Sequence, residues 1–518
     1  MRVTSRHRAT IEHADLNHST STCDYLVIGG GSAGSIVARR LADANIGDVV
    51  LLEAGPNDRY NPSICELARL DEQNETTEWG FKAWPHSSAT RPIEYARAKM
   101  LGGCGGHNDC AFLIPPPEDF VPWRSHCGER WSVENIARHF ARVDSMVHTD
   151  EDPPIGAVSQ AFLDAGAELD LAFNNFRKTI DEGVGAFPLN CLDGTRQSAS
   201  IAYLHNTKKL PDNLVVKTNT LATHLLFDNN RAKGCETDRG EFVARREVIL
   251  ACGAVQTPQL LMVSGIGDTA TLLNAGVKPH IALPGVGQNL LDHAAANIVL
   301  ELSAASSEWE LTPCEVTVLL RSDAREMTPD LLYHFVLRLR EKYASNSGDF
   351  ASANGVKISP NVARPRSRGQ LLIEGPDITH PPRIELNYFS DADGEDMRKM
   401  LHGLRYARRF EHTRAFAALG AKELLPGPSV RSDAALVQYV LDTCETVYHP
   451  AGTCRMGRAD DPLAVVNSEF AVLQTEGLRA VDASVFPDLI SVNINNTVMM
   501  VAESAAEVII SSALTDDT

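Results

Sequence analysis

The sequence predicts an α/β domain with a parallel sheet, joined to a second domain of the α+β class. From Cys23 to Gly55, two apolar runs flank a glycine-rich turn and a segment with helical spacing of apolar residues, as in a βαβ unit. From about residue 296 to 446, strand-like runs alternate with Pro, Gly and Asp turns and precede helix-like segments, which is typical of an antiparallel sheet backed by helices. A length of 518 residues also favours two domains over one.

The βαβ unit has the pattern of a Rossmann-like nucleotide site. Tyr25–Ile28 and Val49–Leu52 are short, wholly apolar runs that predict buried parallel strands, and Ser35–Asp43 predicts the helix between them. A helix that starts directly after a strand points its free N–H groups at that turn. The turn is therefore suited to holding phosphates.

The turn itself reads Gly29-x-Gly31-x-x-Gly34, and the second strand delivers Glu53 nineteen residues after Gly34. Gly29 permits the tight turn, Gly31 lets the backbone approach a pyrophosphate, and Gly34 lets helix and strand pack closely. Glu53 would accept a hydrogen bond from a ribose hydroxyl. A glycine-rich turn without a ligand is the plainer alternative, but the flanking strands and Glu53 favour nucleotide binding. Which nucleotide is bound stays open at this point.

Composition and charge are those of an ordinary soluble protein, with 43% hydrophobic and 22% charged residues. The net charge of −19 argues against a nucleic-acid partner. Eleven cysteines form no CxxC pair or metal-ligand cluster, so we expect free thiols, no metal and a reducing compartment. Residues 1–22 read as a mobile polar tail without a secretory signal, and no run approaches the roughly 18 apolar residues that span a bilayer. We expect a cytoplasmic protein without a membrane span.

A second glycine-rich segment holds four glycines in five positions, from Gly102 to Gly106, followed at once by His107 and Asn108. Such a run cannot form a stable helix or strand interior, but it lets the backbone lie flat against a planar or charged group. A flexible linker is the alternative. The polar pair after the glycines favours a loop that faces a ligand.

The remaining elements follow from local patterns. A helix with Pro258 in its first turn and a glycine C-cap at Gly265 is expected after the strand Val248–Ala251. Further strands are expected at Asn213–Thr218, Ala222–Phe227, Glu241–Leu250, Glu315–Leu320, Leu331–Leu337, Gln370–Glu374 and Gly477–Val481, and further helices at Ala161–Leu169, Asp396–Arg414, Ser432–Thr443 and Thr497–Ser511.

Two residues near the C-terminus are candidates for chemistry. His449 precedes a proline in an irregular, glycine-flanked segment, where it could act as a general base near neutral pH. Asn493 comes just before the last helix, where its amide could orient an alcohol or stabilise an alkoxide. Taken alone, His449 is more simply interpreted as a structural histidine, and Asn493 as part of the turn or cap that starts the helix.

With these motifs in this order, residues 23–512 resemble the glucose–methanol–choline (GMC) flavoprotein oxidoreductases. The segment Gly253-Ala-x-x-Thr-Pro-x-Leu-Leu-x-x-Ser-Gly-Ile-Gly267 satisfies a specific signature of that family at every defined position. Cys104 departs from the family's first signature, and Ile494 stands where related members often have Pro. The resemblance implies that the nucleotide is FAD and that the chain oxidises an alcohol.

The resemblance also implies a division of the chain and a set of site residues. The FAD-binding domain comprises 23–150, 197–295 and 447–512, and the substrate-binding domain comprises 151–196 and 296–446. The FAD-binding residues are Gly29, Gly31, Ser32, Gly34, Glu53, Leu101, Gly102, Gly103, Gly106, His107, Asn108, Ala222, Asp482, Ala483, Asn493 and Thr497. The substrate-binding residues are Asp109, His334, Val447 and His449.

In mechanistic terms, the family's catalytic pair falls on His449 and Asn493. His449 would help remove the hydroxyl proton of a primary alcohol while hydride passes to flavin N5, and Asn493 would hold the alkoxide oxygen. The segment AKMLGGCGGHNDC is most similar to the choline oxidase version of the loop. Covalent attachment of the flavin 8α carbon would then fall on His107.

For the substrate, the choline-handling members place a glutamate at the position of Ala295, and Asp109 stands where they have Ser. Choline itself is therefore doubtful, and a choline-like or amino-sugar alcohol that carries a cation or an amine is the working hypothesis. Oxygen is the expected electron acceptor, with a quinone or carrier as the alternative, and a homodimer is the expected assembly. A flavin-holding lyase without net oxidation is one competing hypothesis, and a non-catalytic FAD sensor is another.

Overall fold

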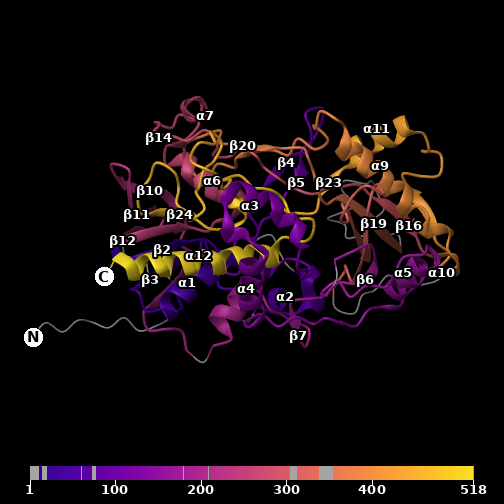
Figure 1. Cartoon of the computed structure of the whole chain (residues 1–518), viewed down its shortest axis with the longest axis horizontal. Helices are drawn as coiled ribbons and strands as arrows, with labels where there is room; N and C mark the ends of the chain where they lie inside the picture. Colours follow the sequence, from indigo (N-terminus) through magenta and orange to yellow (C-terminus); the bar gives the residue numbers. More distant parts are fainter. Residues whose placement is uncertain are drawn as a thin grey trace, which may run out of the picture.

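The computed structural model describes residues 11–13, 20–59, 61–72, 77–178, 180–207, 209–303, 312–337 and 354–516. Most of the predicted N-terminal tail lies outside these ranges. Within it, Ile11–His13 forms a strand (β1) parallel to β9, and the next strand begins at Ser21. Figure 1 shows two sheets at opposite ends of an elongated molecule, with segments from distant parts of the sequence in each.

The first sheet is mostly parallel and has the order β1-β9-β3-β2-β12-β11-β10, with β24 also paired to β12. The strands β2 (Ser21–Ile28), β3 (Val49–Leu52), β9 (Leu214–Thr218) and β12 (Gly240–Leu250) run parallel, as predicted for the βαβ unit. β10 (Ala222–Asp228) and β11 (Arg231–Thr237) add an antiparallel extension, and β24 (Leu478–Ala480) joins from the C-terminal part.

Helix α1 (Ser32–Asp43) packs on this sheet and against α12 (Asn495–Asp516), which also contacts α4 (Val133–Asp144). Among the described residues, α12 alone is long and apolar enough to cross a membrane, with a mean hydropathy of 1.5. However, 72% of its apolar window is buried inside the protein. Such burial is typical of the core helix of a soluble protein.

The second sheet is antiparallel, with the order β22-β16-β19-β18-β17-β6 and the short strands β15 and β23 at its side. Its strands are β6 (Gly183–Ala186), β15 (Ala294–Ala295), β16 (Ile298–Glu301), β17 (Val316–Leu320), β18 (Leu331–Leu337), β19 (Gly355–Val362), β22 (Lys422–Leu425) and β23 (Glu445–Thr446). This is the α+β part that the sequence predicts.

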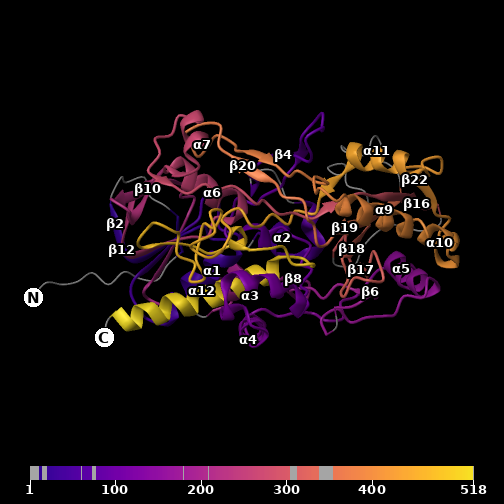
Figure 2. The same ribbon diagram turned by 45° about the horizontal axis from the view of Figure 1, so that its top comes forward.

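Helices cover one face of this sheet, as Figure 2 shows for α5 (Ala157–Glu168) and α9 (Glu395–Ala407). Phe162 of α5 stacks on Phe335 of β18 with ring centroids 4.3 Å apart. Because side chains alternate along a strand, His334 and Val336 point to the opposite face. That face lines the cavity described below.

The other elements are a four-stranded sheet, β20-β21-β4-β5, two two-stranded sheets, β13-β14 and β7-β8, and several short helices. They are α2 (Pro62–Cys65), β4 (Lys82–Trp84), β5 (Ile93–Glu94), α3 (Val121–Cys127), β7 (Cys191–Leu192), β8 (Thr195–Arg196), β13 (Ile266–Gly267), α7 (Thr269–Asn274), β14 (Ile281–Ala282), β20 (Gln370–Leu372), β21 (Arg383–Glu385), α10 (Arg414–Ala418) and α11 (Asp433–Thr443).

The helix predicted at Asp396–Arg414 ends early, at Ala407 of α9, α5 begins four residues before the predicted Ala161, and the start of helix α6 also differs from the prediction. Helix α6 runs from Gly253 to Val263, so Pro258 lies inside it and not in its first turn. Proline has no N–H to donate to the carbonyl four residues earlier. Here the Ala254 carbonyl accepts from the Thr453 hydroxyl at 2.6 Å instead. This substitution of partners lets the helix continue through Pro258.

Candidate active site

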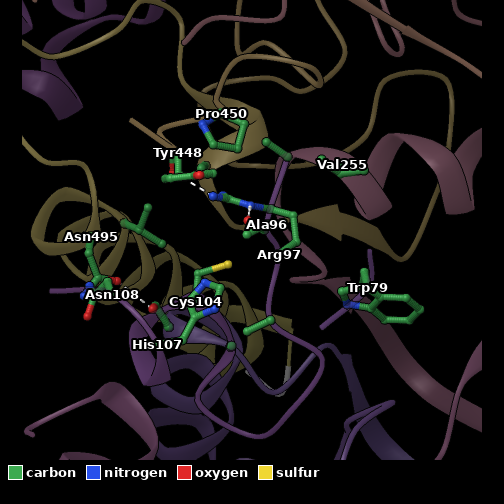
Figure 3. A pocket seen from close by; sticks show the side chains of 18 of the residues that line it. Trp79, Ala96, Arg97, Cys104, His107, Asn108, Val255, Tyr448, Pro450 and Asn495 are labelled. Carbon is green, nitrogen blue, oxygen red and sulfur yellow. Dashed lines mark hydrogen bonds between the residues drawn. The ribbon is translucent and has the colours of Figure 1, made fainter. Parts of the chain in front are cut away.

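A cavity of about 740 Å³ reaches from the α1 turn to the second sheet. Its walls include Gly29, Glu53 and Ala222 from the first sheet, and His334, His449 and Asn493 toward the second. Figure 3 shows Arg97, Cys104, His107, Asn108 and Asn495 around its middle. The cavity thus brings the predicted nucleotide turn and the predicted catalytic pair into one space.

At the nucleotide end, the geometry explains two of the glycines. Gly29 has a φ of +102°, and a Cβ there would lie 2.4 Å from the Ala251 carbonyl oxygen. A Cβ on Gly34 would lie 1.9 Å from the Gly29 carbonyl oxygen, so helix and strand can approach only without it. The backbone N–H groups of Gly30 and Gly55 donate to the two Glu53 oxygens at 2.9 and 2.7 Å.

These bonds fix the Glu53 carboxyl at the wall of the cavity. Burial raises the pKa of Glu53 to about 7, although the two N–H donors act in the opposite direction. Its remaining lone pairs suit ribose hydroxyls. A buried acceptor at this strand end therefore fits the adenosine half of a dinucleotide.

Most of the predicted FAD-binding residues line the cavity. They are Gly29, Gly31, Ser32, Glu53, Gly103, His107, Asn108, Ala222, Asp482, Ala483 and Asn493. Five others do not line it, because they pack behind its wall: Gly34, Leu101, Gly102, Gly106 and Thr497. Two polar atoms in the wall, Asn493 Oδ1 and Asn495 Nδ2, are buried and find no hydrogen-bond partner in the part of the chain that the structure describes. Buried polar atoms are normally paired, so these two fit a wall that receives a polar ligand such as FAD.

His449 lies at the far end, on a segment held by hydrogen bonds. Its backbone N–H donates to Asp292 Oδ1 at 2.9 Å, and the carbonyl of the preceding Tyr448 accepts from Arg97 Nη2 at 2.8 Å (Figure 3). Tyr448 has a φ of +64°, an uncommon conformation for a non-glycine residue. The turn that presents His449 is thus fixed from both sides.

The neighbouring His293 determines which ring nitrogen of His449 carries the proton. His293 Nε2 lies 3.0 Å from the carbonyl oxygens of both Ala363 and Ile490, so it must donate. Neutral His293 then has a lone pair on Nδ1, which lies 2.8 Å from His449 Nδ1. His449 must donate this bond from Nδ1–H. Its Nε2 is left with a lone pair, 3.4 Å from the Asn493 amide nitrogen.

A third histidine has the opposite tautomer by the same reasoning. The amide nitrogen of Asn361 donates to the Leu332 carbonyl at 2.7 Å and lies 3.1 Å from His334 Nδ1. His334 Nδ1 therefore accepts a hydrogen bond from the Asn361 amide. Neutral His334 therefore carries its proton on Nε2, 3.4 Å from Asn493 Nδ2. A hydroxyl group placed between the rings could donate to His449 and accept from His334.

Burial keeps these rings neutral. It lowers the pKa of His293 to about 4 and that of His334 to about 3. The pKa of His449 falls well below its usual value, because of burial and of the two neighbouring histidines. The site therefore offers a neutral base near neutral pH.

The glycine loop forms a charged cluster around His107. Its Nδ1 lies 3.0 Å from Glu78 Oε1. Burial would lower the pKa of His107, but hydrogen bonds to Cys104 and Glu78 raise it to about 9. Burial would raise the pKa of Cys104, but Arg97 and His107 lower it to about 6. At neutral pH these directions give a thiolate beside an imidazolium.

Of the predicted substrate-binding residues, Asp109, His334, Val447 and His449 all line the cavity. Sequence reasoning missed the roles of Glu78, Asp292 and His293, and it missed Lys357 and Glu445, a buried ion pair in the same wall. One signal was available for Lys357. The segment Lys357-Ile-Ser-Pro-Asn361 alternates polar and apolar residues, as a strand does when one face meets a polar cavity. The eleven cysteines are all free, as predicted.

The fold and the site define a flavoprotein oxidoreductase. The GMC oxidoreductase family models match residues 23–295 and 365–502, and the chain belongs to this family. It is 34% identical to choline oxidase of Arthrobacter globiformis and 32% identical to alcohol dehydrogenase [acceptor] of Pseudomonas putida; these matches cover 94 to 95% of this chain and 95% of each relative. Pyridoxine 4-oxidase from Mesorbium loti superposes with a TM-score of 0.85 at 27% identity, over 94% of this chain and 98% of that structure.

These comparisons confirm the predicted family, the fold class and FAD as the cofactor. A formate oxidase structure with a TM-score of 0.85 and 22% identity supports the fold alone. The protein is a flavin-dependent alcohol oxidoreductase. The division into two domains and the roles of single residues stay predictions.

Proposed function

We propose that this enzyme oxidises a primary alcohol to an aldehyde, with oxygen as the electron acceptor. The observation that carries the proposal is the convergence of His449 Nε2, His334 Nε2–H and the Asn493 amide on one end of the cavity. The substrate hydroxyl donates to His449 Nε2, which takes its proton. The Asn493 amide and His334 Nε2–H donate to the oxygen as negative charge develops there.

The chemistry that FAD supplies when bound is acceptance of a hydride at flavin N5. The chain orients the alcohol, excludes water from the buried site and holds the proton on His449. Oxygen is favoured over a quinone or carrier because the His107 loop is similar to the oxidase version. The relatives named choline oxidase and pyridoxine 4-oxidase agree with this choice.

To test this proposal, the purified holoenzyme is mixed with primary alcohols under anaerobic conditions and flavin absorbance is followed. We expect the oxidised flavin band to bleach, and admission of air to restore it. Bleaching that air does not reverse would favour a quinone or carrier acceptor. No bleaching by any alcohol would contradict alcohol oxidation and revive the lyase or sensor hypothesis.

We further infer that His107 is covalently joined to the flavin 8α carbon: the new N–C bond would replace one C–H bond, whose proton is lost to solvent and whose electron pair is accepted by oxygen. Glu78 accepts from Nδ1–H of His107, so the covalent bond would use Nε2, with the Cys104 thiol beside the ring. His107 lines the cavity beside Cys104 and Asn108 (Figure 3), where the loop meets the ligand. A covalent bond would raise the flavin potential and prevent loss of the cofactor.

Acid precipitation tests this inference directly. We expect the yellow colour in the pellet for the wild type, and in the supernatant for His107→Ala, because removal of Nε2 removes the bond. The exposed His126, on helix α3, supplies a matched His→Ala control that should keep its flavin in the pellet. Yellow supernatant from the wild type would show that FAD is held by non-covalent contacts only.

For the substrate, Asp109 in the cavity wall supports an alcohol that carries a cation or an amine, choline-like or an amino sugar. The excess of acidic residues over the whole chain acts in the same direction.

A further inference from the structure

One wall of the cavity is a face of the second sheet with polar side chains in register. His334 pairs with Ser359, and Val336 pairs with Lys357, across the β18–β19 ladder. Cross-strand partners lie on the same face of a sheet. All four residues line the cavity, so Lys357 and Ser359 share the wall with the His334 ring.

A hydrogen-bonded network ties this wall together. Lys357 Nζ lies 2.5 Å from Glu445 Oε1, which also accepts from Asn297 Nδ2 at 2.9 Å. Ser359 Oγ donates to Asn297 Oδ1 at 2.5 Å. Lys357 and Glu445 are only 7% and 8% exposed, and both border the cavity. A charged pair is costly to bury, and the hydrogen bonds around it offset that cost.

The position of Glu445 relates this network to substrate specificity. Glu445 pairs directly with Ala295 across the β15–β23 ladder. Ala295 is the position where the resemblance places a glutamate in choline-handling members. In this chain the carboxylate comes from the adjacent strand, and the Lys357 ammonium already occupies it.

This arrangement discriminates between ligand classes. A trimethylammonium group has no hydrogen to donate, and it could contact Glu445 only by displacing Lys357. An anionic group would meet Glu445 and Asp109 as well as Lys357, so the two carboxylates would oppose it. A hydroxyl group can accept from an ammonium and donate to a carboxylate or amide without breaking the pair.

We propose that the wall formed by Lys357, Ser359 and Glu445, with Asn297 behind it, binds the ring hydroxyls of a polyhydroxylated primary alcohol, a sugar or cyclitol, and rejects quaternary ammonium alcohols. This inference rests on the proposed function, because the same alcohol must reach His449. Together with Asp109, the wall favours an amino-sugar alcohol as the substrate and disfavours a choline-like alcohol.

The test compares three alcohols on the holoenzyme by anaerobic flavin reduction: methyl glucosaminide, 3-aminopropanol and choline. We expect kcat/KM for the glucosaminide to exceed the other two by at least about tenfold, because each hydrogen bond to a charged group contributes substantially. The double variant Lys357→Met/Glu445→Gln removes the pair without leaving one charge buried alone. It should lose about 10- to 100-fold on the glucosaminide and less than about threefold on 3-aminopropanol.

Binding gives a second readout that needs no turnover. myo-Inositol has ring hydroxyls but no primary alcohol, and we expect it to perturb the flavin spectrum with a Kd about tenfold weaker in the double variant. Lys82→Met, which removes an exposed lysine on β4 that pairs with Glu94, is the matched control and should change neither value.

The outcomes separate the two proposals. An equal loss on the glucosaminide and 3-aminopropanol would show a merely structural pair and overturn the inference. Choline as the best substrate would also overturn it, while the proposed oxidation would stand. Failure of every alcohol to reduce the flavin would contradict the proposed function itself.

Discussion

The His449→Ala variant is expected to reduce flavin about 10²- to 10⁴-fold more slowly than the wild type at saturating alcohol. His449 Nε2 has the lone pair that takes the hydroxyl proton, because His293 holds the ring in the Nδ1–H tautomer. Asn493 and His334 remain in the variant and can still orient the oxygen. The measurement is single-turnover flavin reduction by stopped flow under anaerobic conditions.

The pH dependence of flavin reduction is a second test of His449 as the base. His449 acts unprotonated, so the rate falls only as pH drops through its folded pKa, which lies well below 6.5. The wild-type rate should therefore stay level as pH falls from 7.5 to about 6.5, the unperturbed value for histidine. An acid limb centred above 6.5, or a His449→Ala rate within tenfold of the wild type, would show that another group is the base. His126→Ala is the control for loss of an imidazole elsewhere.

The parts of the fold that the sequence predicts well are those where burial dominates. Val49–Leu52 and Leu331–Leu337 have the predicted bounds, because each is an apolar run buried almost throughout. The strand Arg231–Thr237 was not predicted, because its polar residues carry no strand pattern and it is defined by its pairing with β10 and β12, the strands before and after it. Local sequence pattern therefore predicts the buried core strands better than the more polar strands of the sheet extension.

The strand β19 shows why part of the site could not be predicted. Pro360 within it argues against a central strand, since proline cannot donate to the ladder. Lys357 and Ser359 line the cavity, so the alternation of polar and apolar residues in β19 resembles that of a solvent-exposed strand. His449 and Asn493 were assigned to the site by the resemblance to the GMC family, and both line the cavity. The contact of His449 with His293 joins residues 156 positions apart and needed the structure.

Asp292 is the residue whose loss should destabilise the site most. Its Oδ1 accepts from the backbone N–H groups of His293 and His449, each at 2.9 Å. Its Oδ2 accepts from the hydroxyls of Thr446 and Tyr388 at 2.7 Å, and of Tyr95 at 3.2 Å. The carboxyl is buried, so water cannot replace it at these five donors. One side chain thus fixes both the base and the histidine that sets its tautomer.

We expect Asp292→Ala to lower the free energy of unfolding by about 3–5 kcal/mol, because five buried donors lose the carboxyl group that accepts from them. Urea unfolding of the holoenzyme, followed by flavin and tryptophan fluorescence, measures the loss. Asp460→Ala removes an exposed aspartate paired with Arg458 and should leave the free energy of unfolding close to that of the wild type. The free energy of unfolding of Asp292→Asn should lie between those of the two alanine variants, because Asn keeps one acceptor oxygen. Its flavin should be reduced more slowly than that of the wild type, because the His449 turn is less firmly held. An Asp292→Ala protein as stable as the Asp460→Ala control would show that the five donors find new partners.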